Sequence, residues 1–466
     1  MVPSLNAIKI EIDNLIATLH PLLPLVNSHM VDYFTNSVYN TSVPSTLQND
    51  IYNIGCENAI NILLKGAHNS CAFHLNDFIN RTKASRLYNL RDVCLNQSDL
   101  NKKFLEWGCN DVSSLKLKVF VTEKKSHEIE LLTKVIATIY NISKTTHIID
   151  VGGGKGYLSS LLALHHHIPV LGVDSSLVHT DGAIKRVRLL EKAWKCVEHN
   201  PYKSLPSKKD YTLTKIDHLY KQVTEFVTES TDFEQLISDI FLEKSTNFGL
   251  VGLHTCGDLA ATCIKVFNKN NNLRTLCNVS CCYHLLNEEF ESNNSNLNNS
   301  FGFPLSAYLK NKQFKLGRTA LMLSSQSVDR MLYRKELPNK LLFYRSVLEI
   351  LLEKNNVCKT KRQVGKIRRK CDNFVEYVRM SLGNIDIKLD LSNDELIKLY
   401  GDYEVYESQL YVFYLLRCML APLIEAIILL DRLLFLHENG HTTAFLTQLF
   451  DPIISPRCYA LIALKL

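Results

Sequence analysis

The sequence predicts an α/β fold with a parallel β-sheet, because short apolar strands alternate with amphipathic helices from residue 126 onward. The clearest unit is THIIDVGGGKGYLSSLLALH at 145–164, where an apolar run ends in Asp150 and a glycine-rich turn leads into a helical pattern. A second strand, IPVLGVD at 168–174, leads into a helix over 177–199. This repeated order is typical of sheets that bind a ligand at the carboxyl ends of their strands.

Composition places the chain among soluble globular proteins. Its 466 residues predict two or three structural units, and 46% of them are hydrophobic against 21% charged. The net charge of +6 permits nucleic-acid contact without requiring it. The first residues lack a basic segment followed by an apolar core, which argues against a secretory signal or transit peptide. We therefore expect an intracellular protein, cytoplasmic or nuclear, with reduced cysteines.

The first two of four predicted segments are a helical region, 1–115, and a sheet-forming core, 116–286. Apolar residues in the first recur at helical spacing without strand alternation, so we predict packing or substrate contact as its role. The core begins with a helix for which Ser126 is a plausible N-cap. Beyond the elements already named, the core pattern predicts a strand at 211–216, a helix at 231–244, a strand at 248–259, a helix at 260–270 and a strand at 273–285.

The third segment, 287–405, is predicted to be a loop and helical insertion. It opens with an Asn/Ser-rich loop at 287–302 and becomes helical in pattern after 325. Its basic run KNNVCKTKRQVGKIRRK, 354–370, holds eight Lys and Arg residues and no acid. This run could follow a phosphate backbone or form a solvated helix face.

The fourth segment, 406–466, is predicted to complete the sheet. Its apolar stretch at 410–436 contains four charged residues and Pro422, which favours a buried helix over a membrane span. Two strands joined by a turn are expected within 441–466.

Three ligand-binding templates compete for the glycine loop. A phosphate loop requires G-x-x-x-x-G-K-[ST], but no Ser or Thr follows Lys155. The dinucleotide fingerprint G-x-G-x-x-G fails because Tyr157 and Ser159 stand where a third glycine is required in its two possible frames. The pattern D-x-G-x-G-x-G is matched by Asp150, Gly152, Gly154 and Gly156.

This pattern is the loop that S-adenosylmethionine (SAM)-dependent methyltransferases place after their first strand. SAM carries no phosphate, and the backbone must approach its methionine and ribose without side chains in the way. Asp150 could contact the methionyl ammonium, and Asp174, at the end of the next strand, could accept both ribose hydroxyls. The structural alternative is a glycine-rich turn with an ordinary capping acid.

With these residues in hand, the chain resembles the methyltransferase-like protein 25 family over residues 115–466. The resemblance rests on EKKSHEIE (123–130), DVGGGKGYLS (150–159), GLHTCGDLA (252–260), NVSCCYHLL (278–286) and LFDPIISPRCYALIALK (449–465). It implies a Rossmann-like, class I SAM-dependent methyltransferase sheet whose last two strands are C-terminal, with SAM as the cofactor. HTCGDL and CCYH are also similar to a eukaryotic tRNA 2′-O-methyltransferase family, but this chain has no counterpart to that family's zinc modules.

The strand ends provide further site candidates, which we expect to converge on one pocket. His254 and Asp258 are candidate catalytic residues, as a general base or as orienting groups. Alternatively, both satisfy loop backbone groups and cap the next helix. The candidates for the acceptor pocket are Cys256, Cys281, Cys282 and Tyr283. For the thiols the alternative is core packing.

The resemblance adds four residues that precede the glycine loop. It implies that Lys124, Lys125, His127 and Glu128 border the SAM site or the substrate entrance, with His127 as a cofactor-binding candidate and the two lysines as candidates for the substrate pocket. The alternative is an exposed basic turn before a helix. The fourteen cysteines include no C-x-x-C pair. The His and Cys residues near the strand ends match no closed zinc-ligand spacing, so we expect no metal.

The predicted function is SAM-dependent methyl transfer to an RNA acceptor, such as a tRNA or rRNA, or to a protein acceptor. The alternative is a non-catalytic SAM-binding scaffold that interacts through its helical N-terminal region. A dinucleotide-dependent oxidoreductase is disfavoured by Tyr157. The expected partners exclude membranes, and 354–370 is the candidate for phosphate-backbone contact.

Overall fold

The computed structural model describes residues 3–465 except 67–68, 110–111, 113, 118–120, 200–215, 292–299, 366, 368 and 370, and the side chains of 195–199. The chain forms two compact units, each built from non-consecutive segments. Unit 1 contains Met1–Ile16, Ser85–Gly317 and Leu423–Leu466, and unit 2 contains Ala17–Ala84 and Arg318–Pro422. The sequence predicts four consecutive segments instead, because composition along the chain does not reveal which distant helices pack together.

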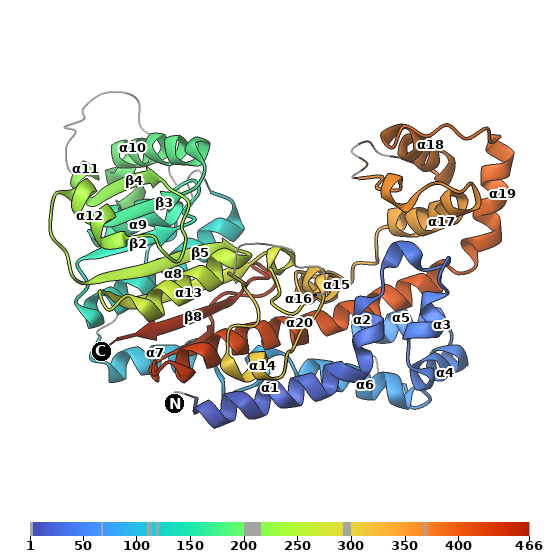
Figure 1. Ribbon diagram of the computed structural model, residues 1–466, viewed down its shortest axis with the longest axis horizontal. Coiled ribbons are helices and arrows are strands. Elements are labelled where there is room, and N and C mark those ends of the chain that lie inside the picture. Colours follow the sequence, from blue (N-terminus) through green and yellow to red (C-terminus); the bar gives the residue numbers. More distant parts are fainter. Residues whose placement is uncertain are drawn as a thin grey trace. The chain divides into compact units, whose positions relative to one another are not determined.

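Unit 1 is built around one eight-stranded sheet in the order β1-β7-β8-β6-β5-β2-β3-β4 (Figure 1). Strand β8 is antiparallel to both of its neighbours, and the other pairs are parallel. The predicted Rossmann-like α/β fold with its two closing strands is confirmed. The strands are β1 (Cys94–Leu95), β2 (His147–Val151), β3 (Val170–Asp174), β4 (Tyr220–Thr224), β5 (Phe248–Cys256), β6 (Leu273–Cys281), β7 (Phe445–Gln448) and β8 (Tyr459–Leu464).

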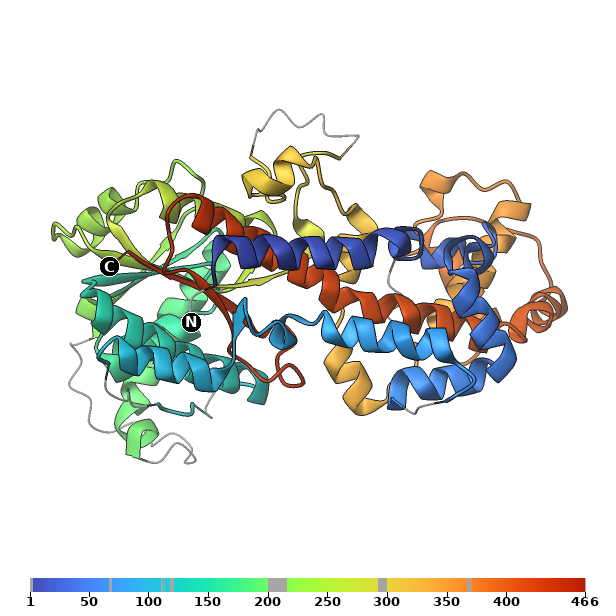
Figure 2. The same ribbon diagram turned by 90° about the horizontal axis from the view of Figure 1, so that it is seen from below.

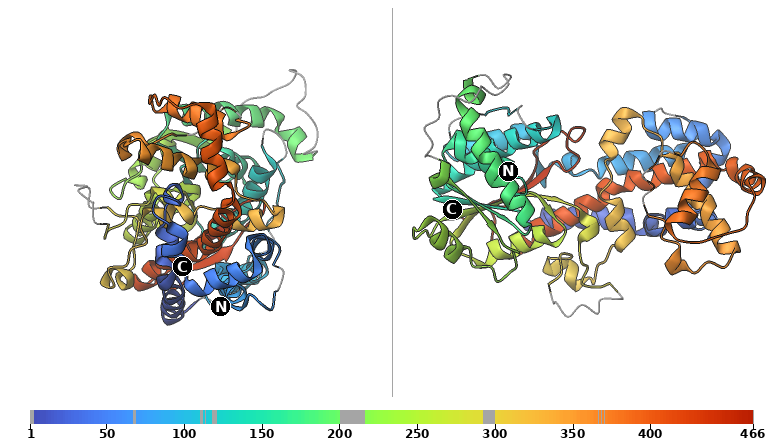
Figure 3. Two further views of the ribbon diagram at one scale, coloured as in Figure 1. Left: turned by 90° about the vertical axis from the view of Figure 1, so that its right-hand side faces the viewer. Right: turned by 90° about the horizontal axis from the view of Figure 1, so that it is seen from above.

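Helices cover both faces of this sheet (Figures 2 and 3). Every residue of β2, β3 and β8 is buried, as expected for central strands that are covered on both sides. The helices of unit 1 are α7 (Gln97–Glu106), α8 (Glu123–Ser143), α9 (Tyr157–His166), α10 (Leu177–His199), α11 (Ile216–Leu219), α12 (Phe233–Phe241), α13 (Asp258–Lys269) and α14 (Ala307–Asn311). Helices α1 (Leu5–Leu19) and α20 (Glu407–Glu438) contribute residues to both units.

The start of α8 differs from the prediction that Ser126 caps it. The N-cap is Thr122, whose backbone is extended and whose side chain accepts a hydrogen bond from the Lys125 amide at 3.3 Å. Ser126 lies inside the first turn, and its hydroxyl donates to the carbonyl of Leu117. The helix therefore begins at Glu123, which brings the whole EKKSHE stretch onto one helix.

Two strands of unit 1 also differ from the prediction. Residues 211–215 of the strand predicted at 211–216 lie outside the described residues, and the strand that pairs with β3 is β4, after α11. Strand β1 lies within the segment that was predicted to be wholly helical. It has two residues, too few to show an alternating pattern, and is formed by parallel pairing of Cys94 with Leu446.

Unit 2 is helical in the described residues, as the sequence predicts. Its helices are α2 (Leu23–Asn27), α3 (Val38–Ser42), α4 (Ser45–Ile54), α5 (Cys56–Lys65), α6 (Phe73–Ala84), α15 (Arg318–Leu323), α16 (Val328–Arg334), α17 (Lys340–Lys354), α18 (Phe374–Asn384) and α19 (Asn393–Glu404). Aromatic rings join α17, α18 and α19, since the Tyr344 ring centroid lies 5.6 Å from that of Phe374 and 5.8 Å from that of Tyr400. Such pairs add to the stability provided by apolar burial.

The basic run 354–370 belongs to unit 2. Lys366, Arg368 and Lys370 lie outside the described residues. Where the run is described beyond α17, it contains a single 3₁₀ turn, Lys359–Lys361, rather than the solvated helix face considered above. Arg362 donates to Glu349 at 2.8 Å, so this guanidinium serves an internal ion pair.

Helix α20 is long and apolar enough, by composition, to cross a membrane, with a mean hydropathy of 2.0 in its most apolar window. That window is 89% buried within the protein, which favours the core-helix interpretation. Its charges are satisfied internally: Arg417 donates to two backbone carbonyls in unit 2, and Asp431 accepts from the backbone of Leu305 and Ser306 in unit 1.

Candidate active site

A cavity of about 1240 Å³ lies in unit 1 at the carboxyl ends of β2, β3, β4 and β5. One part of its wall is formed by the glycine loop and by residues 173–176, at the end of β3 and just after it. The opposite part is formed by residues 254 and 256–259, at the end of β5 and the start of α13, and by Leu285, Asn287, Ser300 and Phe301. This is the edge of the sheet at which open α/β folds bind ligands.

The glycine loop has the shape that its pattern predicts. Gly152, Gly154 and Gly156 all have positive φ angles, between 55° and 70°, where side chains are disfavoured. Gly152 and Gly154 line the cavity, as predicted. Gly156 is not among the lining residues: a Cβ there would lie 2.5 Å from the Tyr220 hydroxyl oxygen and 2.8 Å from the Ala183 Cβ. Its lack of a side chain permits close packing of α9 against neighbouring elements.

Asp174 lines the cavity and joins two loops. Its Oδ2 atom accepts a hydrogen bond from the Gly154 amide at 2.9 Å, and Oδ1 accepts one from the Ser176 amide at 2.9 Å. The Nδ1 atom of His179 lies 3.1 Å from the same Oδ1. Asp174 thus holds the glycine loop against the start of α10, at the position predicted for the ribose-binding acid.

Asp150 lies beneath the loop rather than along the cavity. Its side chain is fully buried, and Oδ2 accepts a hydrogen bond from the Ser159 hydroxyl at 2.6 Å. A Cβ on Gly153 would lie 3.0 Å from Oδ2, so the loop crosses close above this carboxyl. Burial raises the pKa of Asp150 to about 6, although the Ser159 hydrogen bond opposes this shift. Asp150 supports the loop from below, whereas the sequence predicts contact with a methionyl ammonium.

His254 lines the other part of the cavity and pairs with Glu128 of α8. Its Nε2 atom lies 3.0 Å from Glu128 Oε1, and its side chain is 22% exposed. The β5 register shifts between Leu253 and Thr255, and His254 itself has a φ of 66°. A left-handed conformation is unfavourable for a residue with a Cβ, so this bulge is maintained by its surroundings.

Glu128 is fully buried and surrounded by donors. Besides His254, its Oε1 accepts from the Ser455 hydroxyl at 2.6 Å, and Lys125 Nζ lies 2.9 Å from Oε2. Burial alone would raise the pKa of Glu128, but His254, Lys125 and Ser455 hold it well below its usual range. An ionised Glu128 requires a proton on His254 Nε2, which leaves Nδ1 as the basic nitrogen of a neutral imidazole.

The four residues that the resemblance adds are not among those that line the cavity. Lys124 and Lys125 both pair with Glu128, at 3.4 and 2.9 Å. His127 accepts a hydrogen bond from the Asp451 amide at 3.0 Å. Of these residues, Glu128 makes the contact with the cavity, through its hydrogen bond with His254.

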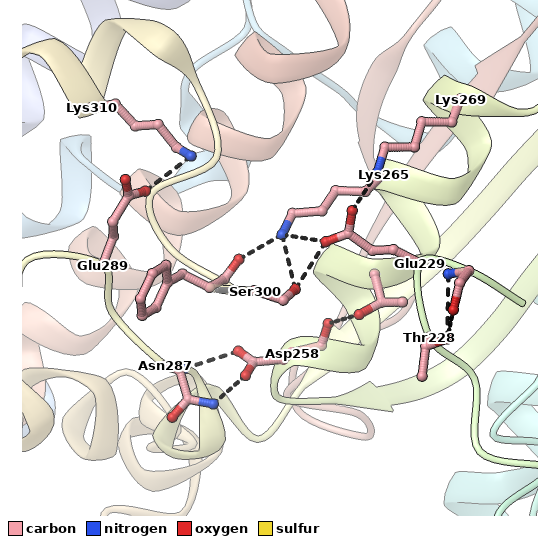
Figure 4. Close-up of polar contacts among 12 residues, drawn as sticks. Thr228, Glu229, Asp258, Lys265, Lys269, Asn287, Glu289, Ser300 and Lys310 are labelled. Carbon is pink, nitrogen blue, oxygen red and sulfur yellow. Dashed lines mark hydrogen bonds and ion pairs between the residues drawn. The ribbon is translucent and has the colours of Figure 1, made fainter. Parts of the chain in front are cut away.

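Asp258 lines the cavity, but its carboxylate already accepts hydrogen bonds from the loop that contains Asn287. It is the first residue of α13, and its carboxyl accepts from the backbone amide of Asn287 at 2.9 Å and from the Asn287 side chain (Figure 4). The helix N-cap is Gly257, so Asp258 does not cap α13 with its side chain. This contact favours the loop-holding alternative for Asp258 over general-base catalysis.

A second polar cluster forms the wall near Asn287 (Figure 4). Lys265 Nζ lies 2.9 Å from Glu229 Oε1, 3.3 Å from Ser300 Oγ and 2.9 Å from the Phe301 carbonyl oxygen. Burial raises the pKa of Glu229, but Lys269, Lys265 and Ser300 lower it to about 2. Residues 225–230, which contribute Glu229, line the cavity but are absent from the predicted site. The sequence prediction places the preceding strand at 211–216, so these residues do not follow a predicted strand end. The pattern YKQVT at 220–224 is the signal that indicates the strand's true position.

Of the four residues predicted for the acceptor pocket, the three cysteines lie together, whereas Tyr283 lies apart from them in the core. Cys256 lines the cavity, and its Sγ lies 3.2 Å from that of Cys281 and 3.3 Å from that of Cys282. The hydrogen bond from Cys281 is the main reason that the pKa of Cys256 is lowered, to about 6, and that of Cys281 is raised. Tyr283 is a core residue instead: it is fully buried and donates to Glu425 at 2.8 Å. It follows the last strand residue by two positions, and its ring turns into the interior.

Comparisons with known proteins agree with this site. Residues 124–289 match a family described as a methyltransferase domain, and this range contains the glycine loop, Glu128, Asp174, His254 and the three thiols. Probable methyltransferase-like protein 25 of Mus musculus is 31% identical over 455 residues, with 74% of this chain and 75% of the relative covered. The chain belongs to the methyltransferase-like protein 25 family. The Homo sapiens relative of the same description is 30% identical over 456 residues, with the same coverage. The predicted family is confirmed, and membership supports methyltransferase activity.

Proposed function

We propose that this protein is a SAM-dependent methyltransferase that acts on an RNA or protein acceptor. The observation that carries the proposal is the cavity whose wall combines a side-chain-free loop, Gly152 to Gly154, with Asp174 and, opposite, His254. Its volume of about 1240 Å³ exceeds the range of roughly 300–1,000 Å³ typical of small-molecule sites, which leaves space for an acceptor group beside the cofactor.

The residues present fit the methionine and ribose of SAM. Gly152 and Gly154 allow close approach of the backbone, and the α9 N-terminus that follows favours a carboxylate. A carboxylate offers about four acceptor positions, and Asp174 uses three for Gly154, Ser176 and His179. One remains for a ribose hydroxyl, and displacement of the half-exposed His179 would free a second.

The bound cofactor would supply the electrophilic methyl group, and the protein would hold the acceptor in line with it. His254 is the group suited to remove a proton from an acceptor that must lose one. Glu128 orients the imidazole, fixes the proton on Nε2 and stabilises the imidazolium that forms when Nδ1 gains a proton. Lys125 and Ser455 keep Glu128 ionised and in place.

An RNA acceptor is supported by the exposed Lys354, Lys359 and Lys361 of the basic run, which could neutralise phosphates. A non-catalytic SAM-binding scaffold is the second candidate, because Asp258 and the wall around Glu229 are held by internal hydrogen bonds.

Two measurements test the proposal. Calorimetric titration should show SAM binding by the wild-type protein and by Asp181→Asn, an exposed acid of α10, and weaker binding by Asp174→Asn. Equal affinity in Asp174→Asn would contradict the site assignment. Incubation with methyl-labelled SAM and separate RNA and protein pools should then label one pool. Binding without label in either pool would favour the scaffold.

A further inference from the structure

The thiols of Cys256, Cys281 and Cys282 form a compact cluster at the wall of the cavity. Their three Sγ–Sγ distances are 3.2, 3.3 and 3.5 Å, and none of the three residues is in a disulfide. Cys256 ends β5 and Cys281 ends the adjacent strand β6, so the parallel pairing of Cys256 with Cys281 brings the first two sulfurs together.

The third thiol joins the cluster through an unusual backbone conformation. Successive residues of a strand point to opposite faces of a sheet, so Cys282 would turn away from Cys281 if the strand continued. Instead, Cys282 has a φ of 50°, which brings its Sγ to 3.5 Å from that of Cys281. The left-handed region is unfavourable for a residue with a Cβ, and such strained residues are typical of functional sites.

The neighbouring loop fixes the cluster from the other side. Gly257, which follows Cys256, has a φ of 54°, and a Cβ there would lie 2.7 Å from the Leu285 Cβ and from its carbonyl oxygen. Its amide donates to the Cys281 carbonyl at 3.3 Å. The two loops that carry the thiols therefore pack directly against each other, which restricts the relative movement of the sulfurs.

Three sulfurs in mutual contact match a metal site better than a disulfide. A disulfide requires two sulfurs at about 2.05 Å and leaves the third without a partner. Zinc–thiolate bonds of about 2.3 Å in tetrahedral geometry place sulfurs ~3.8 Å apart, so each pair would separate by a few tenths of an ångström. Soft thiolate ligands select Zn²⁺ over Mg²⁺ or Ca²⁺.

We propose that Cys256, Cys281 and Cys282 bind one Zn²⁺ ion through three thiolates. Cys256 lines the cavity, so the fourth coordination position faces it and is open to water or to a donor atom of the acceptor. The site combines distant residues in a spacing that no common zinc motif contains. It is independent of the proposed cofactor and would exist whether or not SAM binds.

Metal content is the first test. The full chain is purified under reducing conditions with Zn²⁺ and then freed of excess metal. Inductively coupled plasma mass spectrometry should find one Zn²⁺ retained per protein molecule. Cys256→Ser and Cys282→Ser should retain much less, whereas Cys358→Ser, which changes an exposed thiol of unit 2, should retain it fully. Equal zinc content in all four proteins would overturn the proposal.

Cobalt substitution is the second test. Co²⁺ added to the metal-free protein should produce thiolate-to-metal charge-transfer absorption and the intense visible bands of tetrahedral coordination, both lost in Cys256→Ser. Circular dichroism and SAM titration of the same variants show whether they remain folded and whether the cofactor site is affected separately. An absence of these bands in the wild-type protein, or a disulfide between these cysteines in freshly prepared reduced protein, would overturn the proposal.

Discussion

The glycine loop after β2 and the bulged end of β5 lie at the same edge of the sheet and line the same cavity, but they are shaped by different means. The loop after β2 obtains its positive φ angles from three glycines, which accept them without strain. The bulge near the end of β5 places His254 in the left-handed region, and Glu128, a residue of a distant helix, holds it there. The glycine loop is therefore specified by local sequence, and the bulge depends on tertiary contacts.

The largest expected effect comes from filling the glycine loop. Gly156→Val would place a branched side chain at 2.5 Å from the Tyr220 hydroxyl and in the left-handed region. Overpacking and backbone strain together should reduce the free energy of unfolding by about 3 kcal/mol and abolish SAM binding. Urea unfolding and calorimetry provide the measurements.

Gly182→Ala is the matched control for this substitution. A Cβ at Gly182, within α10, meets no atom within 4 Å. Helix propensity predicts a gain of roughly 0.5–1 kcal/mol. A similar destabilisation by both substitutions would show that the loop has no special requirement for glycine at position 156.

The second effect concerns the bulged end of β5. Glu128→Gln removes the charge that orients His254, so it should lower the rate of methyl transfer by ~10²-fold or more. The affinity for SAM should change little, because Glu128 does not line the cavity. Glu130→Gln, two residues along α8, is the control and should retain activity. Single-turnover assays with labelled SAM separate rate from binding. An equal loss of SAM affinity in Glu128→Gln would instead indicate a structural role.

Asp150 and Glu128 should respond to pH in opposite directions. The raised pKa of Asp150, about 6 against an ordinary 3.8, means that the folded state binds its proton more tightly. Stability contributed at this site therefore rises as the pH falls from about 7 to about 4, by roughly 2 kcal/mol. Glu128 has a lowered pKa, so its contribution is complete above the ordinary value of 4.5 and is lost as the pH falls below it.

Urea unfolding between pH 7 and about pH 3 checks these signs. Asp150→Asn should gain most over the wild type at pH 7, and this gain should shrink toward pH 4. Glu128→Gln should be destabilised at pH 7, and its deficit should shrink only once the pH falls below the ordinary range of glutamate. If the difference in unfolding free energy from the wild type changed with pH in the same way for both variants, the predicted contrast between Asp150 and Glu128 would be contradicted.

The smallest effect is expected at the polar cluster of Lys265, Glu229 and Ser300, of which the last two line the cavity. Lys265→Met removes contacts with Glu229, Ser300 and Phe301 and should cost about 1 kcal/mol while raising the KM for the acceptor. Lys269→Met, which removes only the Lys269–Glu229 pair, should have a smaller effect because Lys269 is largely exposed. Equal effects would show that the wall depends on the charge of Glu229 alone.

The fold and one part of the site could be predicted from the sequence. Apolar strands, the glycine pattern and Asp174 are local features whose meaning does not depend on distant residues. The other part could not, because the His254–Glu128 pair joins residues 126 positions apart and the thiol cluster depends on the backbone turn at Cys282. His127 and Glu128 are adjacent in sequence, but in the structure they contact different residues. Glu128 contacts His254 at the cavity, whereas His127 contacts Asp451, and the sequence does not reveal this difference.

The position of β8 determines when the sheet can form during synthesis. Strand β8 lies between β6 and β7, and β1 joins the sheet through β7 alone. Residues 94–95 leave the ribosome early, yet their partners at 446–447 follow some 350 residues later, and residues 459–464 must arrive before β7 and β1 can attach to β6. Until then one edge of β6 stays unpaired, which is the kind of exposed strand that chaperones protect.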